Sequence, residues 1–284
     1  GKTTLAKGIM GLTAKPYGKI KSGKILYEGE NLLEMDKKQL RRIRGEHISM
    51  IFQDPMTSLN PVMTVGDQIA EAIRNHDKLS RVDAAKKAAE ILELVGIPSA
   101  RGSEYPHQFS GGMKQRVVIA IALACNPKIL IADEPTTALD VTIQAQILEM
   151  IRDLRERFRT SMLLITHDLG VIAQNCDYVS VIYAGEIVET GTVHDIFRHK
   201  LHPYTEGLFS SIPNINEDVE RLVPIEGLMP DPTNLPAGCA FCDRCRFATE
   251  RCRTEHPRLV SMGGEEGSHQ VRCHRYNETR EEGE

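Results

Sequence analysis

The first four residues, Gly1-Lys2-Thr3-Thr4, match the second half of a phosphate-binding loop of the pattern G-x-x-x-x-G-K-[ST]. In such loops, backbone N–H groups and a helix N-terminus hold the phosphates of a nucleotide. The lysine reaches the β- and γ-phosphates and the next hydroxyl ligates Mg²⁺, so Lys2 and Thr3 are candidates for these two roles. A match of four residues also arises by chance, and from this stretch alone an ordinary chain terminus is the competing interpretation.

Two adjacent acids, Asp133 and Glu134, follow an apolar run at 129–132. The run predicts a buried strand, and ligands of parallel sheets bind where such strands end. Asp133 is therefore a candidate for the Mg²⁺ shell, and Glu134 for the base that polarises an attacking water. Many strands end in an acidic turn, but the phosphate-loop residues in the same chain favour the catalytic interpretation.

Five of the seven cysteines lie between residues 239 and 273. An odd number of cysteines without a visible secretory signal favours reduced thiols over a disulfide framework. Thiolates at this spacing suit an iron–sulfur cluster or Zn²⁺, and thiols without any metal are a third interpretation. The five are Cys239, Cys242, Cys245, Cys252 and Cys273. Cys125 and Cys176 lie in apolar helical context, where we expect them to pack.

The elements that must position these residues are predicted from hydrophobic periodicity. Strands are expected at 24–27, 46–52, 128–132 and 161–166, and helices at 5–12, 65–96 and 143–158. Ser110 could cap a further helix that runs through 117–124. Strands that alternate with helices indicate a parallel α/β sheet, and the helical stretch 69–125 indicates an inserted subdomain. Prolines after residue 203 indicate a loop-rich tail.

The composition excludes several classes of protein. The chain has 284 residues, 41% of them hydrophobic and 26% charged, and a formal net charge of −4. These values are ordinary for a globular protein and unlike a disordered chain or a collagen. The absence of a basic excess argues against a nucleic-acid partner. No apolar run reaches the roughly 18 residues needed to span a bilayer, and no secretory signal is visible.

Further motifs give the chain a family resemblance. Residues 110–116, Ser-Gly-Gly-Met-Lys-Gln-Arg, resemble the signature motif of ATP-binding-cassette (ABC) ATPases, and they precede the acidic pair as in that family. Gln53 resembles the Q-loop glutamine, residues 138–140 resemble the D-loop, and His167 resembles the switch histidine. The runs 50–69, 104–116 and 202–213 resemble the dipeptide, oligopeptide and nickel importers of this family. The resemblance covers essentially the whole chain.

The resemblance implies a composite site in which two ATPase subunits close head to tail around ATP. Glu134 and His167 would be catalytic, and Thr3, Gln53 and Asp133 would hold Mg²⁺. The residues implied to contact ATP are Gly1, Lys2, Thr3, Thr4, Gln53, Asp133 and Asp140, together with Ser110, Gly111 and Gly112, which would cap the ATP of the partner. Met113 departs from the family, which has glutamine there. The strand and the glycine-rich half of the loop precede this point in the family, so we expect the chain to be N-terminally truncated.

The implied fold is α/β, a P-loop ABC-type nucleotide-binding domain. Its core would comprise residues 1–68 and 126–200, with a helical subdomain at 69–125 and a small cysteine-rich C-terminal domain at 201–284. The implied C-terminal ligand set for a [4Fe–4S] cluster is Cys239, Cys245, Cys252 and Cys273. Cys242 is an additional thiol and a possible substitute.

The implied function is ATP hydrolysis that drives import of dipeptides, oligopeptides or nickel. The chain would act peripherally at the cytoplasmic face of the membrane, with a second and different ATPase subunit and two membrane permeases. An extracytoplasmic solute-binding protein would be an indirect partner. The alternative is a non-transport ABC ATPase with an iron–sulfur cluster that acts on the ribosome or on DNA.

Overall fold

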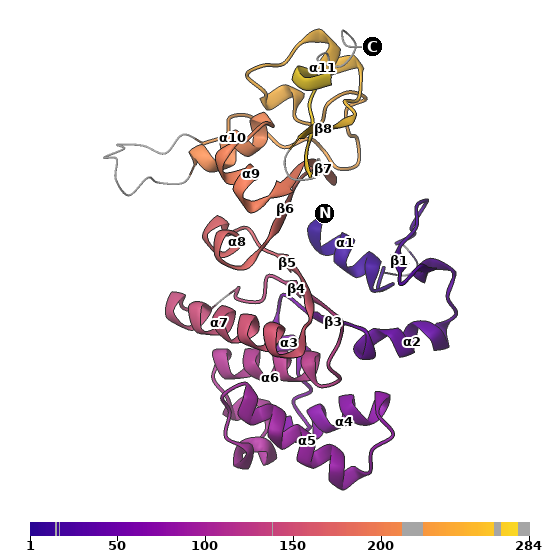
Figure 1. Ribbon diagram of the computed structural model, residues 1–284, viewed down its shortest axis with the longest axis vertical. Coiled ribbons are helices and arrows are strands. Elements are labelled where there is room, and N and C mark those ends of the chain that lie inside the picture. Colours follow the sequence, from indigo (N-terminus) through magenta and orange to yellow (C-terminus); the bar gives the residue numbers. More distant parts are fainter. Residues whose placement is uncertain (15, 17, 138, 212–223, 264–267, 278–284) are drawn as a thin grey trace. The chain divides into compact units, whose positions relative to one another are not determined.

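The computed structural model describes residues 1–14, 16, 18–137, 139–211, 224–263 and 268–277 (Figure 1). The chain divides into two compact units. The larger is Thr3–Leu169, and the smaller combines Gly1–Lys2 with Gly170–Glu284. Within the described ranges, no helix is long and apolar enough to cross a membrane. The predicted domain boundaries at 68, 125 and 200 stay predictions.

A parallel sheet forms the centre of the larger unit. Its strands are β3 (Ile48–Ile51), β4 (Ile129–Asp133) and β5 (Ser161–Ile165), in the order β3-β4-β5. All pairs are parallel, with Ile51 opposite Ala132 and Asp133 opposite Ile165. Three of the four predicted strands form this parallel sheet as expected, whereas the fourth, at 24–27, belongs to a separate antiparallel hairpin. Asp133 therefore lies at the carboxyl end of the middle strand, where a parallel sheet binds its ligands.

The two faces of this sheet pack against different helices because successive side chains of a strand point to opposite sides. Met50 and Ile131 pack on one side with Ala6 and Met10, from helix α1 (Lys2–Ile9) and the residue after it. Side chains of the alternate positions join the main hydrophobic core on the other side, with helices α4 to α7. The residues from the strands are the buried Ile51, Leu130 and Ala132 and the partly buried Met162 and Leu164.

Further helices and a short hairpin complete the larger unit around the sheet. The helices are α2 (Lys37–Glu46), α3 (Pro55–Ser58), α4 (Val65–His76), α5 (Arg81–Leu94) and α6 (Gly111–Leu123), and α7 (Val141–Phe158) follows β4. The hairpin pairs β1 (Leu26–Tyr27) with β2 (Glu30–Asn31). Short 3₁₀ turns lie at Leu32–Glu34, Ser99–Ser103 and Pro106–Gln108. In Figure 1, α6 runs beside α7, and the two are in contact.

The predicted helix over 65–96 is two helices. The chain leaves helical geometry after His76, and Ser80 begins α5 because its hydroxyl accepts a hydrogen bond from the Asp83 backbone N–H at 3.1 Å. This side chain satisfies one of the N–H groups that every helix start leaves free.

The smaller unit is built on an antiparallel sheet. Its strands β6 (Tyr178–Tyr183), β7 (Glu186–Thr192), β8 (Leu259–Gly263) and β9 (His269–Arg272) lie in the order β6-β7-β9-β8. The helices are α8 (Leu169–Asn175), α9 (Val193–Arg198), α10 (Pro203–Ser210), α11 (Glu250–Thr254) and α12 (His274–Asn277), and a 3₁₀ turn lies at Cys242–Arg244. The tail was predicted to be loop-rich, but two of its segments add strands to the sheet of β6 and β7.

One buried carboxylate connects this sheet to the segment before α10. Glu189, on β7, is fully buried and accepts hydrogen bonds from the backbone N–H groups of Leu201 and His202, both at 2.9 Å. His269 of β9 lies 2.9 Å from the same carboxylate through Nε2. These contacts satisfy an acid that would be costly to bury alone.

Candidate active site

The first turn of α1 meets the end of β4. The Thr3 hydroxyl donates a hydrogen bond to Asp133 Oδ1 at 3.1 Å, across 130 residues of sequence. Asp133 is 1% exposed, so its carboxylate is held inside the protein at this point. Oxygen ligands of this kind suit Mg²⁺, which prefers carboxylates, hydroxyls and phosphates. The two residues expected to share Mg²⁺ therefore lie together.

Glu134, the next residue, accepts hydrogen bonds from two side chains and contacts a third. Gln53 Nε2 donates to its Oε2 at 2.8 Å, and the Thr137 hydroxyl donates to the same oxygen at 3.0 Å. His167 Nδ1 lies 3.4 Å from the other oxygen, Oε1. The Glu134 side chain is 19% exposed and that of His167 is 75% exposed. The carboxylate of Glu134, the predicted base, is therefore held in one orientation by hydrogen bonds while part of it remains accessible to water.

Hydrogen bonding keeps this carboxylate ionised. Partial burial by itself raises the pKa of Glu134. The hydrogen bonds from Thr137 and His167, together with the charge of His167, lower this pKa by more than burial raises it. The net result is a pKa below the usual range of glutamate. An ionised carboxylate can accept a proton from water, as a general base must.

The backbone of Glu134 is strained. Its φ is +48°, in the left-handed region that residues with a Cβ rarely adopt. Such a conformation typically costs about 1–3 kcal/mol and persists only where the surroundings enforce it. Here the Glu134 N–H donates to the Ile165 carbonyl of β5 at 2.9 Å, and its own carbonyl accepts from the Thr137 N–H at 3.2 Å.

The residues of the signature motif begin helix α6. The Ser110 hydroxyl accepts a hydrogen bond from the Met113 N–H at 3.4 Å, so the predicted cap is confirmed. Gly112 has a packing reason to lack a side chain, because a Cβ there would lie 2.8 Å from Cγ2 of Ile143 on α7. At Gly111 the nearest atom to such a Cβ is 3.8 Å away, which is an ordinary contact.

The remaining predicted nucleotide-binding residues lie at helix starts. Lys2 and Thr4 belong to the first turn of α1 and Gly1 precedes it, and all three are exposed. Asp140 is the exposed N-cap residue of α7. Ala138, in the predicted D-loop, lies outside the described residues.

Comparison with known proteins identifies the family. A family model described as "ABC transporter" matches residues 1–137, and one described as "Oligopeptide/dipeptide transporter, C-terminal region" matches residues 188–252. The oligopeptide transport ATP-binding protein AppD of Bacillus subtilis is 50% identical over 280 residues, which are 98% of this chain and 84% of AppD. The chain belongs to the ATP-binding subunits of peptide ABC transporters.

Other members of the ABC family agree with this assignment. OppD of Bacillus subtilis, an oligopeptide transport ATP-binding protein, is 55% identical over 92% of this chain and 74% of its own length. DppD of Lactococcus lactis, a dipeptide transport ATP-binding protein, is 55% identical over 87% of this chain and 72% of its own. The alternative of an ABC ATPase that acts on the ribosome or DNA is not supported, because these relatives are transport proteins.

Solved ABC structures share the fold. The dimeric, post-hydrolysis ATP-binding cassette MJ0796 with ADP and phosphate is 28% identical, with a TM-score of 0.59 over 68% of this chain and 81% of that one. CbiO1 of Clostridium perfringens is 29% identical, with a TM-score of 0.60 over 70% of this chain and 76% of that one. The predicted ABC nucleotide-binding fold is therefore confirmed, whereas the cysteine-rich C-terminal domain is not.

Four thiols of this ABC subunit lie within electrostatic range of one another. Burial raises the pKa of Cys239 to about 11, and the nearby Cys252, Cys273 and Cys245 raise it further. Burial also raises the pKa values of Cys245 and Cys273, with added contributions from Cys252 for both and from Cys245 for Cys273. All six pairs of this set therefore interact. In the part of the chain that the structure describes, however, no group of three or more His, Cys, Asp or Glu is arranged to hold a metal ion, so the predicted cluster is not confirmed.

Cys242, the additional thiol, interacts with two members of that set. It is buried, which raises its pKa, and it interacts with Cys252 and Cys245 and with the guanidinium of Arg253. Cys125, far from these thiols in sequence, packs with the helices of the larger unit as predicted, and burial raises its pKa to about 11.

Two residues that contact the active site of this ABC subunit were missed by the sequence analysis. Thr137 holds Glu134 through its hydroxyl, and the spacing of three residues within a turn could have suggested it. Gln115, on α6, is 1% exposed, and its Nε2 donates to the carbonyl oxygen of Pro135 at 2.5 Å. No local signal reports that contact, since it joins residues 20 positions apart on two elements.

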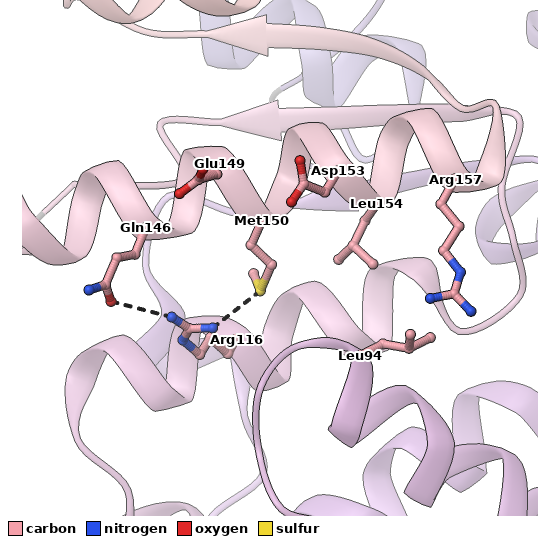
Figure 2. Close-up of a pocket in the computed structure, with 8 residues that line it drawn as sticks. All are labelled: Leu94, Arg116, Gln146, Glu149, Met150, Asp153, Leu154 and Arg157. Carbon is pink, nitrogen blue, oxygen red and sulfur yellow. Dashed lines mark hydrogen bonds between the residues drawn. The ribbon is translucent and has the colours of Figure 1, made fainter.

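A cavity of about 440 Å³ lies along one face of α7 (Figure 2). The guanidinium of Arg116 reaches into it from α6 and contacts Met150 Sδ and Gln146 Oε1, both at 3.5 Å. Arg116 also donates to the Val95 carbonyl at 2.8 Å, at the end of α5. The other lining residues are Leu94, Glu149, Asp153, Leu154 and Arg157, so the predicted ATP-site residues are not among them. We assign this cavity to the packing of α6, not to nucleotide binding.

Proposed function

We propose that this chain is the ATP-hydrolysing subunit that drives import of dipeptides or oligopeptides. The observation that carries the proposal is the arrangement after β4, where Asp133 contacts Thr3 and the next residue, Glu134, is held and ionised. A part-buried pair of oxygen groups beside a directed carboxylate suits attack of water on a phosphoanhydride. The names of the relatives, all peptide transport ATP-binding proteins, supply the coupling to transport.

The phosphates would lie at the start of α1. Lys2 would pair with the β- and γ-phosphates, while Gly1 and Thr4 complete the turn whose N–H groups face them. Thr3 and Asp133 would hold Mg²⁺, with Gln53 as a further oxygen ligand. When bound, Mg²⁺ draws negative charge from the phosphoryl oxygens.

Glu134 would act as the base. As the water oxygen bonds to the γ-phosphorus, Glu134 accepts the proton of that water and the bond to the β,γ-bridging oxygen breaks. His167 would donate a hydrogen bond to a γ-phosphate oxygen. His167 lies 3.4 Å from Glu134 in this structure, and because its side chain is 75% exposed it has room to turn toward the phosphate.

Each ATP would be enclosed by two subunits. Ser110, Gly111 and Gly112 would cap the ATP bound by the partner, since glycines allow close backbone approach and a helix N-terminus attracts anions. Asp140, at the start of α7, would line the same interface. The MJ0796 cassette, which shares this fold, is a dimer in its solved structure, and that state supports such a pairing.

We infer that the partners are a second ABC ATPase encoded as a different chain and two membrane permeases. The subunit would act at the cytoplasmic face of the membrane, docked near Gln53 through the helices of 69–96. The solute-binding protein would be an indirect partner. Peptides are favoured over nickel because the matched relatives carry peptide names.

We also propose a [4Fe–4S] cluster held by Cys239, Cys245, Cys252 and Cys273. The support is that the Cys239 N–H donates to the Cys252 carbonyl at 2.8 Å, which brings two of the four residues together across the tail, and that thiolates are the preferred ligands of such clusters. When bound, the cluster would cross-link segments of the tail, and its binding free energy would stabilise their fold. Cys242 would lie beside this set.

The test is transport in proteoliposomes that contain the assembled transporter. ATP on the side of the ATPases should drive uptake of a labelled dipeptide or oligopeptide and not of Ni²⁺. Glu134→Gln should keep ATP binding and lower hydrolysis and uptake by about 10²-fold or more, because a positioned base contributes about 10²–10⁴-fold. Hydrolysis within twofold of wild type would remove Glu134 from the role of base, and uptake of Ni²⁺ alone would refute the peptide substrate.

A further inference from the structure

A buried side chain of α6 reaches the turn that carries Glu134. Gln115 is 1% exposed, and its amide donates to the carbonyl oxygen of Pro135 at 2.5 Å. Its other polar atom, Oε1, is buried and has no hydrogen-bond partner among the described residues. A methionine or leucine would be less costly to bury here, since an unpaired polar atom in the interior is unfavourable. The polar side chain is therefore explained by the contact that its Nε2 makes.

That contact acts on a strained segment. Glu134 has a φ of +48°, and its own backbone groups are held by Ile165 and Thr137. The next residue is a proline, which has no N–H, so its carbonyl is the only backbone group through which this position can be held. Gln115 supplies the donor to that carbonyl. A strained conformation lasts only where its surroundings over-determine it, and this hydrogen bond is one of those restraints.

The helix that carries Gln115 is itself fixed. Arg116, the next residue on α6, contacts Gln146 and Met150 of α7 (Figure 2). It also donates to the Val95 carbonyl at the end of α5. One turn earlier, at its N-terminus, α6 approaches α7 so closely at Gly112 that a Cβ would clash with Ile143. Gln115 thus extends from a helix that is held on both sides, and it can transmit the position of that helix to the turn.

We propose that Gln115 is a positioning residue for Glu134. Its amide holds the Pro135 carbonyl and so keeps the carboxylate of the preceding residue aimed at the water-attack position. The same helix begins with Ser110, Gly111 and Gly112, which would cap the partner's ATP, so one rigid element connects the cap of one ATP with the base that acts on the other. This inference rests on the proposed ATP hydrolysis and adds to it a residue that does not touch nucleotide.

The variant that tests this proposal is Gln115→Met in the assembled transporter. The hydrolysis rate is divided by the number of ATP-binding sites, so that misfolded protein does not contribute to the measured kcat. Methionine has a similar length and cannot donate to the carbonyl. The matched control is Gln68→Met, because Gln68 is also a buried glutamine whose Nε2 donates to backbone carbonyls, those of Asn60 and Met63, on α4. Gln115→Leu serves as a second variant.

We expect Gln115→Met to lower kcat by about tenfold or more and to change the Kd for ATP by less than about twofold, because a positioned base contributes about 10²–10⁴-fold and only its aim is lost. Gln68→Met should lower the melting temperature similarly and keep kcat per site. In a Glu134→Gln background, Gln115→Met should still form the ATP-closed complex, since the base is then already removed.

Three results would overturn the inference. They are a kcat of Gln115→Met and Gln115→Leu within twofold of wild type, a loss of ATP binding that matches the loss of rate, and an equal loss of kcat in Gln68→Met. A wild-type transporter that does not hydrolyse ATP would instead refute the proposed function, and the two failures are distinguished by that measurement.

Discussion

Gln53 Nε2 donates a hydrogen bond to Glu134 Oε2 at 2.8 Å. The two residues are 81 positions apart, and each has a separate role in the proposed reaction. Gln53 is expected to bind Mg²⁺ through its amide oxygen. In this structure its amide nitrogen instead donates a hydrogen bond to the carboxylate of the proposed base. The contact therefore holds the amide of Gln53 against the base, and Gln53 must release Glu134 before its amide oxygen can serve Mg²⁺.

The first prediction concerns this pair. Gln53→Glu should be more damaging than Gln53→Ala, because a second carboxylate beside Glu134 raises the pKa of the base and disfavours its ionised form. We expect Gln53→Ala to lower kcat by about tenfold, the order of one hydrogen bond to a charged group, and Gln53→Glu to lower it further. Steady-state ATPase rates at saturating ATP measure both. Equal rates for the two variants would show that the 2.8 Å contact does not persist during turnover.

The second prediction concerns Thr137, whose hydroxyl lowers the pKa of Glu134. Thr137→Val keeps the shape and removes the donor, so the pKa of Glu134 should rise and the acidic limb of the kcat profile should move to higher pH. Thr137→Ser keeps the hydroxyl and should leave that limb unchanged. The rate of the valine variant near neutral pH should fall by about tenfold. A valine profile that overlays the serine profile would contradict this account.

The parts that the sequence predicts are those with a local cause. The strands at β3 to β5 follow from apolar runs, and the cap at Ser110 follows from one side chain bonding its own helix start. The pair of Thr3 and Asp133 follows from the rule that parallel strands present ligands at their carboxyl ends. Ser80 was a readable helix start that the apolar pattern of 65–96 obscured.

The parts that it misses depend on contacts between distant segments. The hydrogen bond of Gln115 to Pro135 exists only because α6 packs beside the turn after β4. Strands β8 and β9 are only five and four residues long, and β9 pairs with β7, a strand formed about 80 residues earlier in the chain, while β8 pairs with β9. Pairing with a distant strand cannot be recognised from the hydrophobic pattern of the short segment itself.

The third prediction concerns Gly112. A Cβ at this position would lie 2.8 Å from Ile143 Cγ2, so Gly112→Ala should destabilise the larger unit by about 1–3 kcal/mol through overpacking. The double variant Gly112→Ala with Ile143→Ala should recover part of the loss. Gly111→Ala is the control, since its Cβ would meet its nearest neighbour at 3.8 Å. Urea unfolding measures all three, and a Gly112→Ala protein as stable as Gly111→Ala would contradict the packing argument.

The fourth prediction concerns His202, which is 1% exposed and caps α10 by accepting a hydrogen bond from the Tyr204 N–H at 3.0 Å. Burial lowers the pKa of His202 to about 4 from its ordinary value of 6.5. Between these values the unfolded chain binds a proton that the folded chain does not. Stability should therefore fall as the pH drops from 6.5 toward 4, by at most about 1.4 kcal/mol per pH unit from this residue.

The substitution His202→Asn isolates that contribution. Asparagine is a good N-cap residue and does not titrate, so the variant should lose some packing at neutral pH and show a flatter dependence of stability on pH below 6.5. Denaturant midpoints at several pH values measure the slope. His107→Asn, at an exposed histidine, is the control and should follow the wild-type slope. A slope for His202→Asn as steep as that of wild type would assign the acid sensitivity to other groups.

The last prediction tests the ligands of the proposed cluster. Burial raises the pKa values of Cys239 and Cys273, so without a bound cation these thiols keep their protons at neutral pH. Iron must displace those protons, which makes loading weaker as the pH falls. Protein purified without oxygen should be brown, should contain about four irons per chain and should bleach in air.

Two cysteine variants separate the ligands from their neighbour. Cys273→Ser should lose the colour and the iron, because Cys273 interacts with Cys245 and Cys252 and closes the set from the far end of the tail. Cys242→Ser should keep both, since Cys242 lies beside the set in this proposal. ATP binding by the larger unit should survive in both variants, as none of these thiols belongs to that unit. Colourless protein with one zinc per chain would refute the iron cluster, and loss of iron in Cys242→Ser alone would move the ligand set to the run Cys239, Cys242 and Cys245.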